Sequence, residues 1–193
     1  MTNNSDTNTY ILIQGMLTCI LALCSVSTFA QDKLKTQKMT TSDFTTTIQV
    51  DQTPEEVFNA INNVRGWWSE EIEGSTDKLN DEFRYHYQDV HRCKMKIIEF
   101  IPNEKVVWLV LDNYFKFTKD KSEWTGTKIS FEIAEQDNKP GNYRTRLRFT
   151  HVGLDPGIEC FDSCSNSWSQ LIQQSLFSLI TTGKAEPIAL DEP

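Results

Sequence analysis

The sequence predicts an α+β domain in which a curved antiparallel β-sheet wraps around one long C-terminal α-helix. Between Phe161 and Thr182, apolar residues recur at steps of three and four, which is the period of a helix with one apolar face. Upstream, five strand-like segments follow one another with mostly short turns, and short turns join antiparallel strands. The long helix is the only predicted element large enough to cover the apolar face of that sheet, so the sheet should curve around it.

Length and composition fit one globular domain with flexible ends. The chain has 193 residues, of which 38% are hydrophobic and 24% are charged. Its formal net charge is -8 and its pI is about 4.9, so it lacks the basic footprint of a nucleic-acid-binding protein. We therefore expect no nucleic-acid partner, while the acidic balance mainly indicates solubility.

The first 30 residues differ from the rest in composition and are typical of a secretory signal peptide. They contain no Lys or Arg and a single acidic residue, and Tyr10–Ala30 is mostly apolar. Thr28 and Ala30 are small enough for the −3 and −1 positions of a signal-peptidase site. The pattern predicts cleavage after Ala30 and an exported protein, periplasmic or secreted, without a stable membrane anchor.

Two other interpretations of this segment stay open. The apolar run approaches the ~20 residues needed to span a bilayer, so it could remain as an uncleaved anchor. Alternatively, the chain truly starts at Met39, which would make the protein cytoplasmic. Residues 31–42 are polar, Lys-rich and without periodicity, and are predicted to be a flexible leader in front of the domain.

The domain is predicted to begin with a strand and a capped helix. Phe44–Val50 alternates and is rich in β-branched residues, as strands are. Thr53, Pro54 and Glu56 are typical of a helix start, in which the threonine is the N-cap and the glutamate closes a capping box. That helix should end near Asn62, and a polar loop leads to the next strand.

Five strands and the long helix complete the predicted domain. Four of these strands alternate apolar and polar residues, whereas Lys105–Leu111 is almost wholly apolar, as a strand covered on both faces would be. Asp112–Trp124 is predicted to be a long aromatic and charged connection. Gly183 should end the closing helix, so that the domain spans 43–185 with a tail at 186–193. The predicted strands are residues 82–88, 91–100, 105–111, 127–134 and 143–152.

Four stretches of the chain resemble one protein superfamily. Residues 47–61, 66–68, 124–127 and 146–151 read TIQVDQTPEEVFNAI, GWW, WTGT and RLRFTH. This pattern is similar to the START/Bet v 1-like (SRPBCC) superfamily, and most similar to its branch related to the C-terminal domain of the Hsp90 ATPase activator Aha1. The resemblance covers roughly residues 43–185 and implies a helix-grip fold, with a lumen between the sheet and the C-terminal helix.

The resemblance implies several functions. Members of the superfamily bind lipids, hormones or polyketides, a few are enzymes, and one branch stimulates Hsp90. We predict non-catalytic binding of a small apolar or aromatic ligand in the lumen, with no cofactor. An Aha1-like chaperone-associated interaction module with a protein partner is one alternative, although export would separate the protein from cytoplasmic Hsp90-type chaperones. A cyclase-like enzyme of the same fold is the other.

Aromatic residues dominate the predicted lumen. Tyr85 and Tyr87 alternate inward on one strand, and their hydroxyl groups are the best candidates for polar contacts with a ligand. Trp67 and Trp68 either pack at the helix–sheet junction or form the rim of the cavity, and if the lumen binds a ligand, one of the two should lie near the mouth. The same rings could instead fill a solid core. The predicted ligand-binding residues are Trp67, Trp68, Phe83, Tyr85, Tyr87, Met95, Trp108, Phe131, His151 and Trp168.

The sequence predicts no catalytic group and no metal site. Nucleophile-elbow, P-loop, dinucleotide and zinc-binding motifs are absent. His86 and His91 flank a hairpin turn, and both are expected to point outward or to sit at the strand end, too few for a metal site. His151 should face inward as a hydrogen-bonded core residue. Cys160 and Cys164 could form a disulfide if their segment is a loop, whereas a regular helix would keep them as free thiols.

Overall fold

The computed structural model describes residues 42–139 and 142–188 of the chain. The predicted signal peptide, nearly all of the leader and most of the tail lie outside the described residues, so the expectations about them stay predictions. Within the described ranges, no helix is both long enough and apolar enough to cross a membrane.

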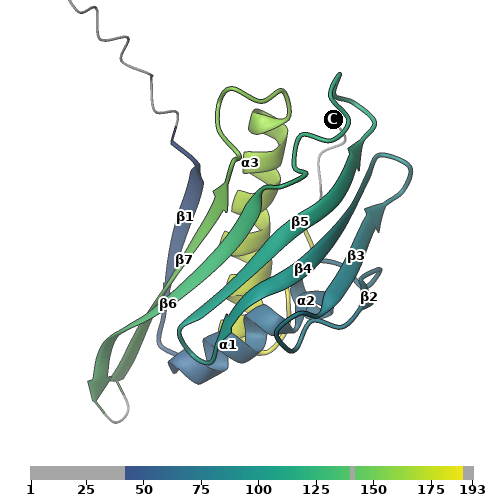
Figure 1. Cartoon of the computed structure of the whole chain (residues 1–193). Helices are drawn as coiled ribbons and strands as arrows, with labels where there is room; N and C mark the ends of the chain where they lie inside the picture. The colour runs from purple at the N-terminus through teal and green to yellow at the C-terminus, as the bar shows by residue number, and fades with distance from the viewer. Residues whose placement is uncertain (1–41, 140–141, 189–193) are drawn as a thin grey trace, which may run out of the picture. The chain divides into compact units, whose positions relative to one another are not determined.

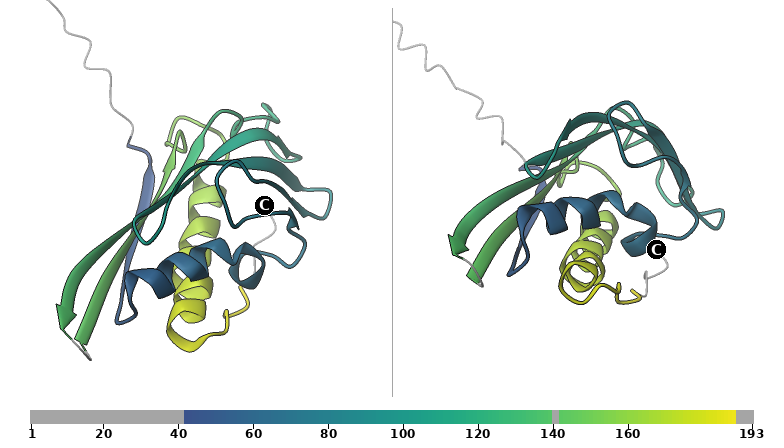
Figure 2. Two further views of the ribbon diagram at one scale, coloured as in Figure 1. Left: turned by 60° about the horizontal axis from the view of Figure 1, so that its bottom comes forward. Right: turned by 90° about the horizontal axis from the view of Figure 1, so that it is seen from below.

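Seven antiparallel strands form one sheet in the order β1-β7-β6-β5-β4-β3-β2 (Figure 1). The sheet is curved, and the helices lie on its concave side (Figure 2). This confirms the predicted α+β architecture. The elements are β1 (Phe44–Val50), α1 (Pro54–Asn62), α2 (Val64–Trp67), β2 (Glu73–Gly74), β3 (Glu82–Tyr87), β4 (His91–Ile101), β5 (Lys105–Phe115), β6 (Lys128–Lys139), β7 (Asn142–Val152), α3 (Phe161–Gln170), the π-helical segment η1 (Leu171–Leu176) and α4 (Phe177–Thr182).

Helix α1 starts at the predicted capping box. The Thr53 hydroxyl accepts a hydrogen bond from the backbone N–H of Glu56 at 3.3 Å, and the Glu56 carboxylate accepts one from the backbone N–H of Thr53 at 2.8 Å. These bonds satisfy two N–H groups that a helix start otherwise leaves unpaired. Val57 and Ile61 are fully buried and anchor the helix on the domain core.

The closing helix has the predicted ends but an unpredicted middle. It runs without a break through α3, η1 and α4, and Gly183 ends it with a left-handed φ of 77°. Residues Leu171–Leu176 form π-helical turns, which are wider than α-helical ones and shift the side chains that follow. In this segment the Ser175 hydroxyl donates a buried hydrogen bond to the Trp67 carbonyl oxygen at 2.6 Å. The π segment therefore joins the closing helix to α2.

Strand β5 is longer than predicted. It continues to Phe115, so the prediction that a connection begins at Asp112 is wrong for residues 112–115, which belong to the strand. The pairing with β4 shifts by one residue between Lys94 and Met95, and beyond this irregularity Asn113 and Phe115 face the buried side. The apolar run stops at Asp112, which hid the continuation from a reading based on hydrophobicity. The segment predicted as a loop after α1 likewise contains α2 and β2.

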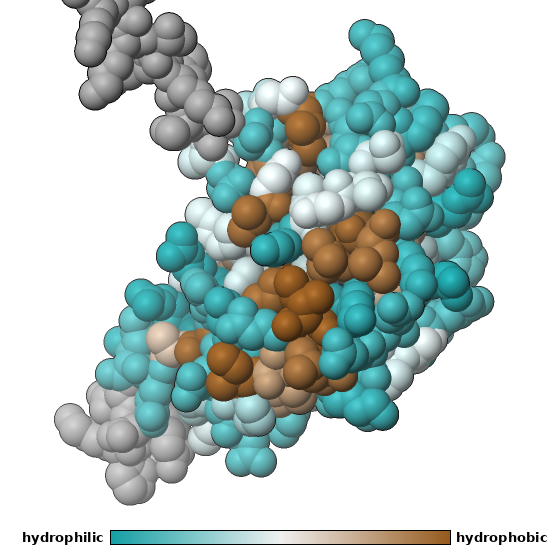
Figure 3. Space-filling view, viewed as in Figure 1, coloured by the Kyte–Doolittle hydropathy of each residue, from teal (hydrophilic) through white to brown (hydrophobic). Residues whose placement is uncertain are grey.

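The outer face of the sheet carries a short apolar band, defined here as Ile98, Val107 and Leu109. Val107 is buried, Leu109 is half-buried and Ile98 is 37% exposed. Figure 3 shows apolar side chains gathered along the middle of this face, with hydrophilic ones around them. The nearly continuous apolar pattern of β5 thus reflects a core-facing side and a partly covered outer side.

Candidate functional site: an aromatic pocket

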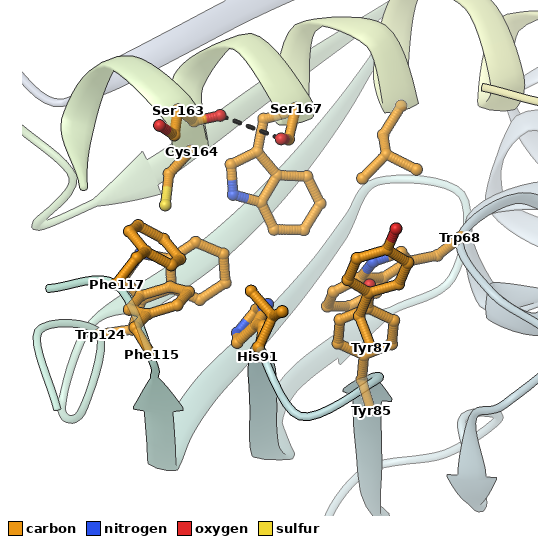
Figure 4. Close-up of a pocket in the computed structure, with 13 residues that line it drawn as sticks. Trp68, Tyr85, Tyr87, His91, Phe115, Phe117, Trp124, Ser163, Cys164 and Ser167 are labelled. Atoms are coloured by element: carbon orange, nitrogen blue, oxygen red, sulfur yellow. Dashed lines mark hydrogen bonds between the residues drawn. The ribbon is translucent and has the colours of Figure 1, made fainter. Parts of the chain in front are cut away.

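A pocket of about 80 Å³ lies where the β3–β4 hairpin, the loop after β5 and helix α3 meet (Figure 4). We call it the aromatic pocket. All of its lining residues are uncharged at neutral pH, and most are aromatic or apolar. Trp68, directly after α2, and the β3–β4 hairpin residues Tyr85, Tyr87, Val90 and His91 form one side. The end of β5 and the following loop contribute Phe115, Phe117 and Trp124, and the closing helix contributes Ser163, Cys164, Ser167, Trp168 and Leu171.

Four of the ten predicted ligand-binding residues line this pocket: Trp68, Tyr85, Tyr87 and Trp168. The other six lie deeper, in a packed core where none is more than 3% exposed: Trp67, Phe83, Met95, Trp108, Phe131 and His151. The structure therefore separates the predicted lumen into a solid part and an open part.

The tryptophan pair explains why the deep part is solid. The indole rings of Trp67 and Trp68 both stack on Trp108, with ring centroids 6.3 and 6.1 Å apart. The Trp67 indole N–H also donates to the Ile61 carbonyl oxygen at 3.1 Å, which fixes the ring inside. Both indoles are buried, which agrees with packing at the helix–sheet junction, and Trp68 also forms part of the pocket wall. The volume left in the aromatic pocket, about 80 Å³, is well below the ~300–1,000 Å³ of ordinary ligand pockets.

His91 is the pocket residue that the sequence interpretation placed wrongly. It lies at the strand end, as expected, but its ring points inward, between Phe115 at 4.4 Å and Trp124 at 5.0 Å between ring centroids. Its Nε2 atom is buried and has no hydrogen-bond partner among the described residues. Burial lowers the pKa of His91 to about 3, so the imidazole is neutral at pH 7. The alternation of β4 could have predicted this inward orientation, because His91 lies two residues before buried Cys93 and therefore on the same side of the strand.

His86, in contrast, faces outward as predicted. Its Nε2 atom lies 2.9 Å from the Glu71 carboxylate, and half of its side chain is exposed. Phe115, Phe117 and Trp124 were not predicted as pocket residues, because they fall in the segment taken for a connection. The high aromatic content of that segment was the signal in the sequence that could have identified them as pocket residues.

Comparison with known proteins bears on the fold. No family model matches the sequence, and no curated protein is significantly similar to it. Solved structures do match. The solution structure of the Aha1 dimer from Colwellia psychrerythraea has a TM-score of 0.58 at 22% identity, covering 75% of this chain and 99% of that one. Protein SSP2350 from Staphylococcus saprophyticus has a TM-score of 0.55 at 16% identity, covering 77% and 98%.

The domain has the START/Bet v 1-like fold. A third match, the conserved protein of unknown function EF2215 from Enterococcus faecalis, agrees with this at a TM-score of 0.51 and 13% identity, covering 76% of this chain and 75% of that one. The predicted resemblance to the START/Bet v 1-like superfamily and to Aha1 is thereby confirmed at the level of the fold.

In this START/Bet v 1-like domain, His151 has a structural role. The Trp168 indole, which can only donate, gives its N–H to Nδ1 of His151 at 3.0 Å. The proton of the neutral ring must then be on Nε2, which donates to the Thr127 hydroxyl at 2.9 Å, and that hydroxyl donates to the Trp124 carbonyl oxygen. Burial, with a contribution from His91, lowers the pKa of His151 to about 3. Both ring nitrogens are therefore engaged: Nδ1 holds the closing helix to β7, and Nε2 holds Thr127, just before β6.

The two pocket tyrosines differ in exposure. Tyr85 is 4% exposed, and burial raises the pKa of its phenol well above the usual range. Its ring lies against Trp68, with centroids 4.7 Å apart. Tyr87 is half-buried near the mouth. The Tyr85 hydroxyl group thus stays protonated, as a neutral hydrogen-bonding group.

Beside the pocket, the Glu123 carboxylate joins the loop after β5 to the start of α3. Glu123, in the loop after β5, accepts hydrogen bonds from the backbone N–H groups of Glu159 and Cys160 at 2.7 and 2.9 Å. Cys160 is the N-cap of α3, so the carboxylate also sits at the positive end of a helix. Cys160 and Cys164 are both free thiols, with a helical backbone bond between them at 2.8 Å, and the described part of the chain contains no disulfide.

Proposed function

We propose that the domain binds a small apolar or aromatic molecule in the aromatic pocket, without catalysis. The observation that supports this best is the combination of an open mouth, a wall of aromatic rings and an uncharged lining. Ligand sites are typically concave and apolar with a few placed polar groups. Here those groups are the imidazole of His91 and the tyrosine hydroxyls.

The size of the pocket favours a one-ring molecule over a lipid or a polyketide. One water needs about 10–15 Å³ measured in the same way, so 80 Å³ holds several waters or one ring. A larger guest would have to displace the stacked indoles of Trp67 and Trp68, which are part of the packed core.

The chemistry of the lining favours binding over reaction. General acid–base catalysis needs a group that changes protonation near the working pH. His91 stays neutral at pH 7, and both nitrogens of His151 are engaged in structural hydrogen bonds. Among the described residues, no cluster of three His, Cys, Asp or Glu side chains could hold a metal ion. A cyclase-like activity therefore has little support here.

Binding can be tested by titrating the domain with toluene in isothermal titration calorimetry. We expect saturable binding by the wild type. Ser167→Phe, which projects a ring into the pocket from α3, should weaken it at least tenfold, on the order of one lost contact worth 1.4 kcal/mol. Asn166→Phe adds the same ring at the neighbouring exposed position and should leave the affinity unchanged. A wild type without saturable binding would contradict the proposal.

An Aha1-like interaction module is the second candidate. The outer apolar band is its only support here: Ile98 is 37% exposed and Leu109 is half-buried, and apolar residues on the solvent side of a sheet can mark protein contacts. The fold likeness to the Aha1 dimer structure agrees with it but is limited to the fold.

Cellular location separates the two candidates. If the predicted signal peptide is cleaved, the intact mass of protein from the native host should correspond to a chain starting at Gln31. Such an exported protein could not meet a cytoplasmic chaperone. A chain that starts at Met1 or Met39 would contradict the export prediction and restore the second candidate.

A further inference from the structure

The outer face of the sheet concentrates positive charge on an otherwise acidic protein. Among the described strand side chains of this face, nine are basic and five are acidic, whereas the whole chain has a formal net charge of -8. Alternation assigns them to the outer face, because their neighbours along each strand are the buried residues. We call this surface the basic face. Its basic residues are Arg84, Arg92, Lys94, Lys96, Lys105, Lys128, Arg144, Arg146 and Arg148, and its acidic residues are Glu73, Glu82, Glu99, Asp112 and Glu132.

The arginines of β7 are placed where strand pairing does not neutralise them. Arg146 lies across from Ala134 on β6 and from Gln49 on β1, and its same-face neighbours along β7 are Arg144 and Arg148. Opposite charges on neighbouring strands stabilise a sheet, whereas like charges close together destabilise it. No described carboxylate lies within ion-pair distance of Arg146. The row of arginines therefore costs stability in the free domain, which favours a role in binding.

The outer apolar band lies inside the basic face. Leu109 is directly between Lys96 on β4 and Lys128 on β6 in the sheet register. Ile98, on the β4 side of the band, is 37% exposed. Figure 3 shows the apolar band with hydrophilic side chains on both sides of it. An apolar centre inside a polar rim rich in arginine is the usual anatomy of a protein–protein interface.

The electrostatics of the basic face select an acidic partner of limited size. The pKa of Glu82 is lowered by a hydrogen bond from Lys94 and by the charges of Lys94, Lys96 and Arg84, so the potential at the β3–β4 part of the face is positive. DNA or an anionic bilayer would extend past this face and approach the acidic remainder of the domain, within a Debye length of about 8 Å. An acidic protein surface can contact the basic face alone.

We propose that the basic face binds a protein partner through an acidic surface that has apolar residues at its centre. The partner's carboxylates pair with the arginines of β7 and with Lys96 and Lys128, and its apolar residues cover the outer apolar band. This inference goes beyond ligand binding in the aromatic pocket and does not depend on it. It also defines the partner chemistry that an interaction module would need.

The test measures fluorescence anisotropy with three labelled peptides of equal length, built from repeating Glu-Leu-Glu, Ser-Leu-Ser or Glu-Ser-Glu units. We expect saturable binding of the Glu-Leu-Glu peptide, about tenfold tighter than the uncharged peptide and about threefold tighter than the peptide without leucine. The double variant Arg146→Gln/Arg148→Gln should weaken it about fivefold. Lys119→Gln/Lys184→Gln removes the same charge at exposed positions outside the sheet and should change the affinity less than about twofold.

Two measurements on the wild type cover the case in which the arginine variant does not fold. Raising NaCl from about 50 to about 500 mM should weaken binding of the Glu-Leu-Glu peptide about tenfold. The peptide should also shift the guanidinium Nε–H resonances of Arg146 and Arg148 in a ¹H–¹⁵N spectrum. The indole N–H of Trp168, which lines the aromatic pocket, should stay in place.

Several results would overturn the inference. These are the absence of saturable peptide binding, binding that does not respond to salt, and equal weakening by the two double variants. Equal affinities for the Glu-Leu-Glu and Glu-Ser-Glu peptides would remove the apolar centre from the proposed interface. Tighter arginine-dependent binding to phosphatidylserine vesicles or to a DNA duplex would replace the protein partner by that polyanion. Toluene binding should be equal in the wild type and Arg146→Gln/Arg148→Gln, so its failure contradicts the proposed ligand function alone.

Discussion

Leu176→Ala is expected to lower the free energy of unfolding by ~2–5 kcal/mol, the usual cost of truncating a core leucine. Leu176 is completely buried at the end of the π-helical segment. Its neighbours cannot collapse easily into the space left behind, because the turn is fixed by the hydrogen bond from Ser175 to Trp67. Urea unfolding followed by circular dichroism at pH 7 measures the change in midpoint and slope.

Phe177→Ala is the matched control on the next residue of the same helix. Phe177 is 37% exposed, so its truncation should cost less than ~1 kcal/mol, as partly exposed positions usually do. If Leu176→Ala lowers the free energy of unfolding by less than ~0.5 kcal/mol, or by as much as Phe177→Ala does, this helix face is not packed in the core.

Sequence patterns predicted those features that depend on local chemistry or on simple periodicity. The start of α1 follows from Thr53 and Glu56, whose side chains reach only their own helix. The end of the closing helix follows from Gly183, which takes a left-handed conformation that other residues avoid. The sheet followed from alternation, because one dry face requires every second residue to be apolar.

The lumen could not be predicted in the same way. Alternation says which side of a strand Met95 or Phe131 faces, but not whether the rings opposite leave a gap. That depends on Trp67 and Trp68, whose positions are set by the short helix α2 and by the π segment. Such tertiary packing has no signature in a single sequence. His91 was a different kind of miss, because its shared parity with buried Cys93 was visible in the sequence, and only the inward direction of its side chain was not predicted.

Lowering the pH from 7 to 5 is expected to destabilise the domain by ~4 kcal/mol, or ~2 kcal/mol for each of His91 and His151, as an upper estimate. Burial holds the pKa of both residues at about 3 in the folded state, against about 6.5 when unfolded. The unfolded chain therefore binds more protons than the folded one between pH 6.5 and 3. Stability is complete above pH 6.5 and falls as the pH is lowered through that window.

Urea unfolding of the wild type and of His91→Phe, each at pH 7 and pH 5, isolates the contribution of His91. A difference in stability between the variant and the wild type at pH 7 does not affect the test, because only the loss between the two pH values is compared. We expect that loss to be about half as large in His91→Phe, because His151 still titrates on unfolding. An equal loss in the wild type and His91→Phe would mean that the His91 imidazole is already accessible to protons in the folded domain, and the unpaired Nε2 would then be a hydrated atom at the mouth of the pocket.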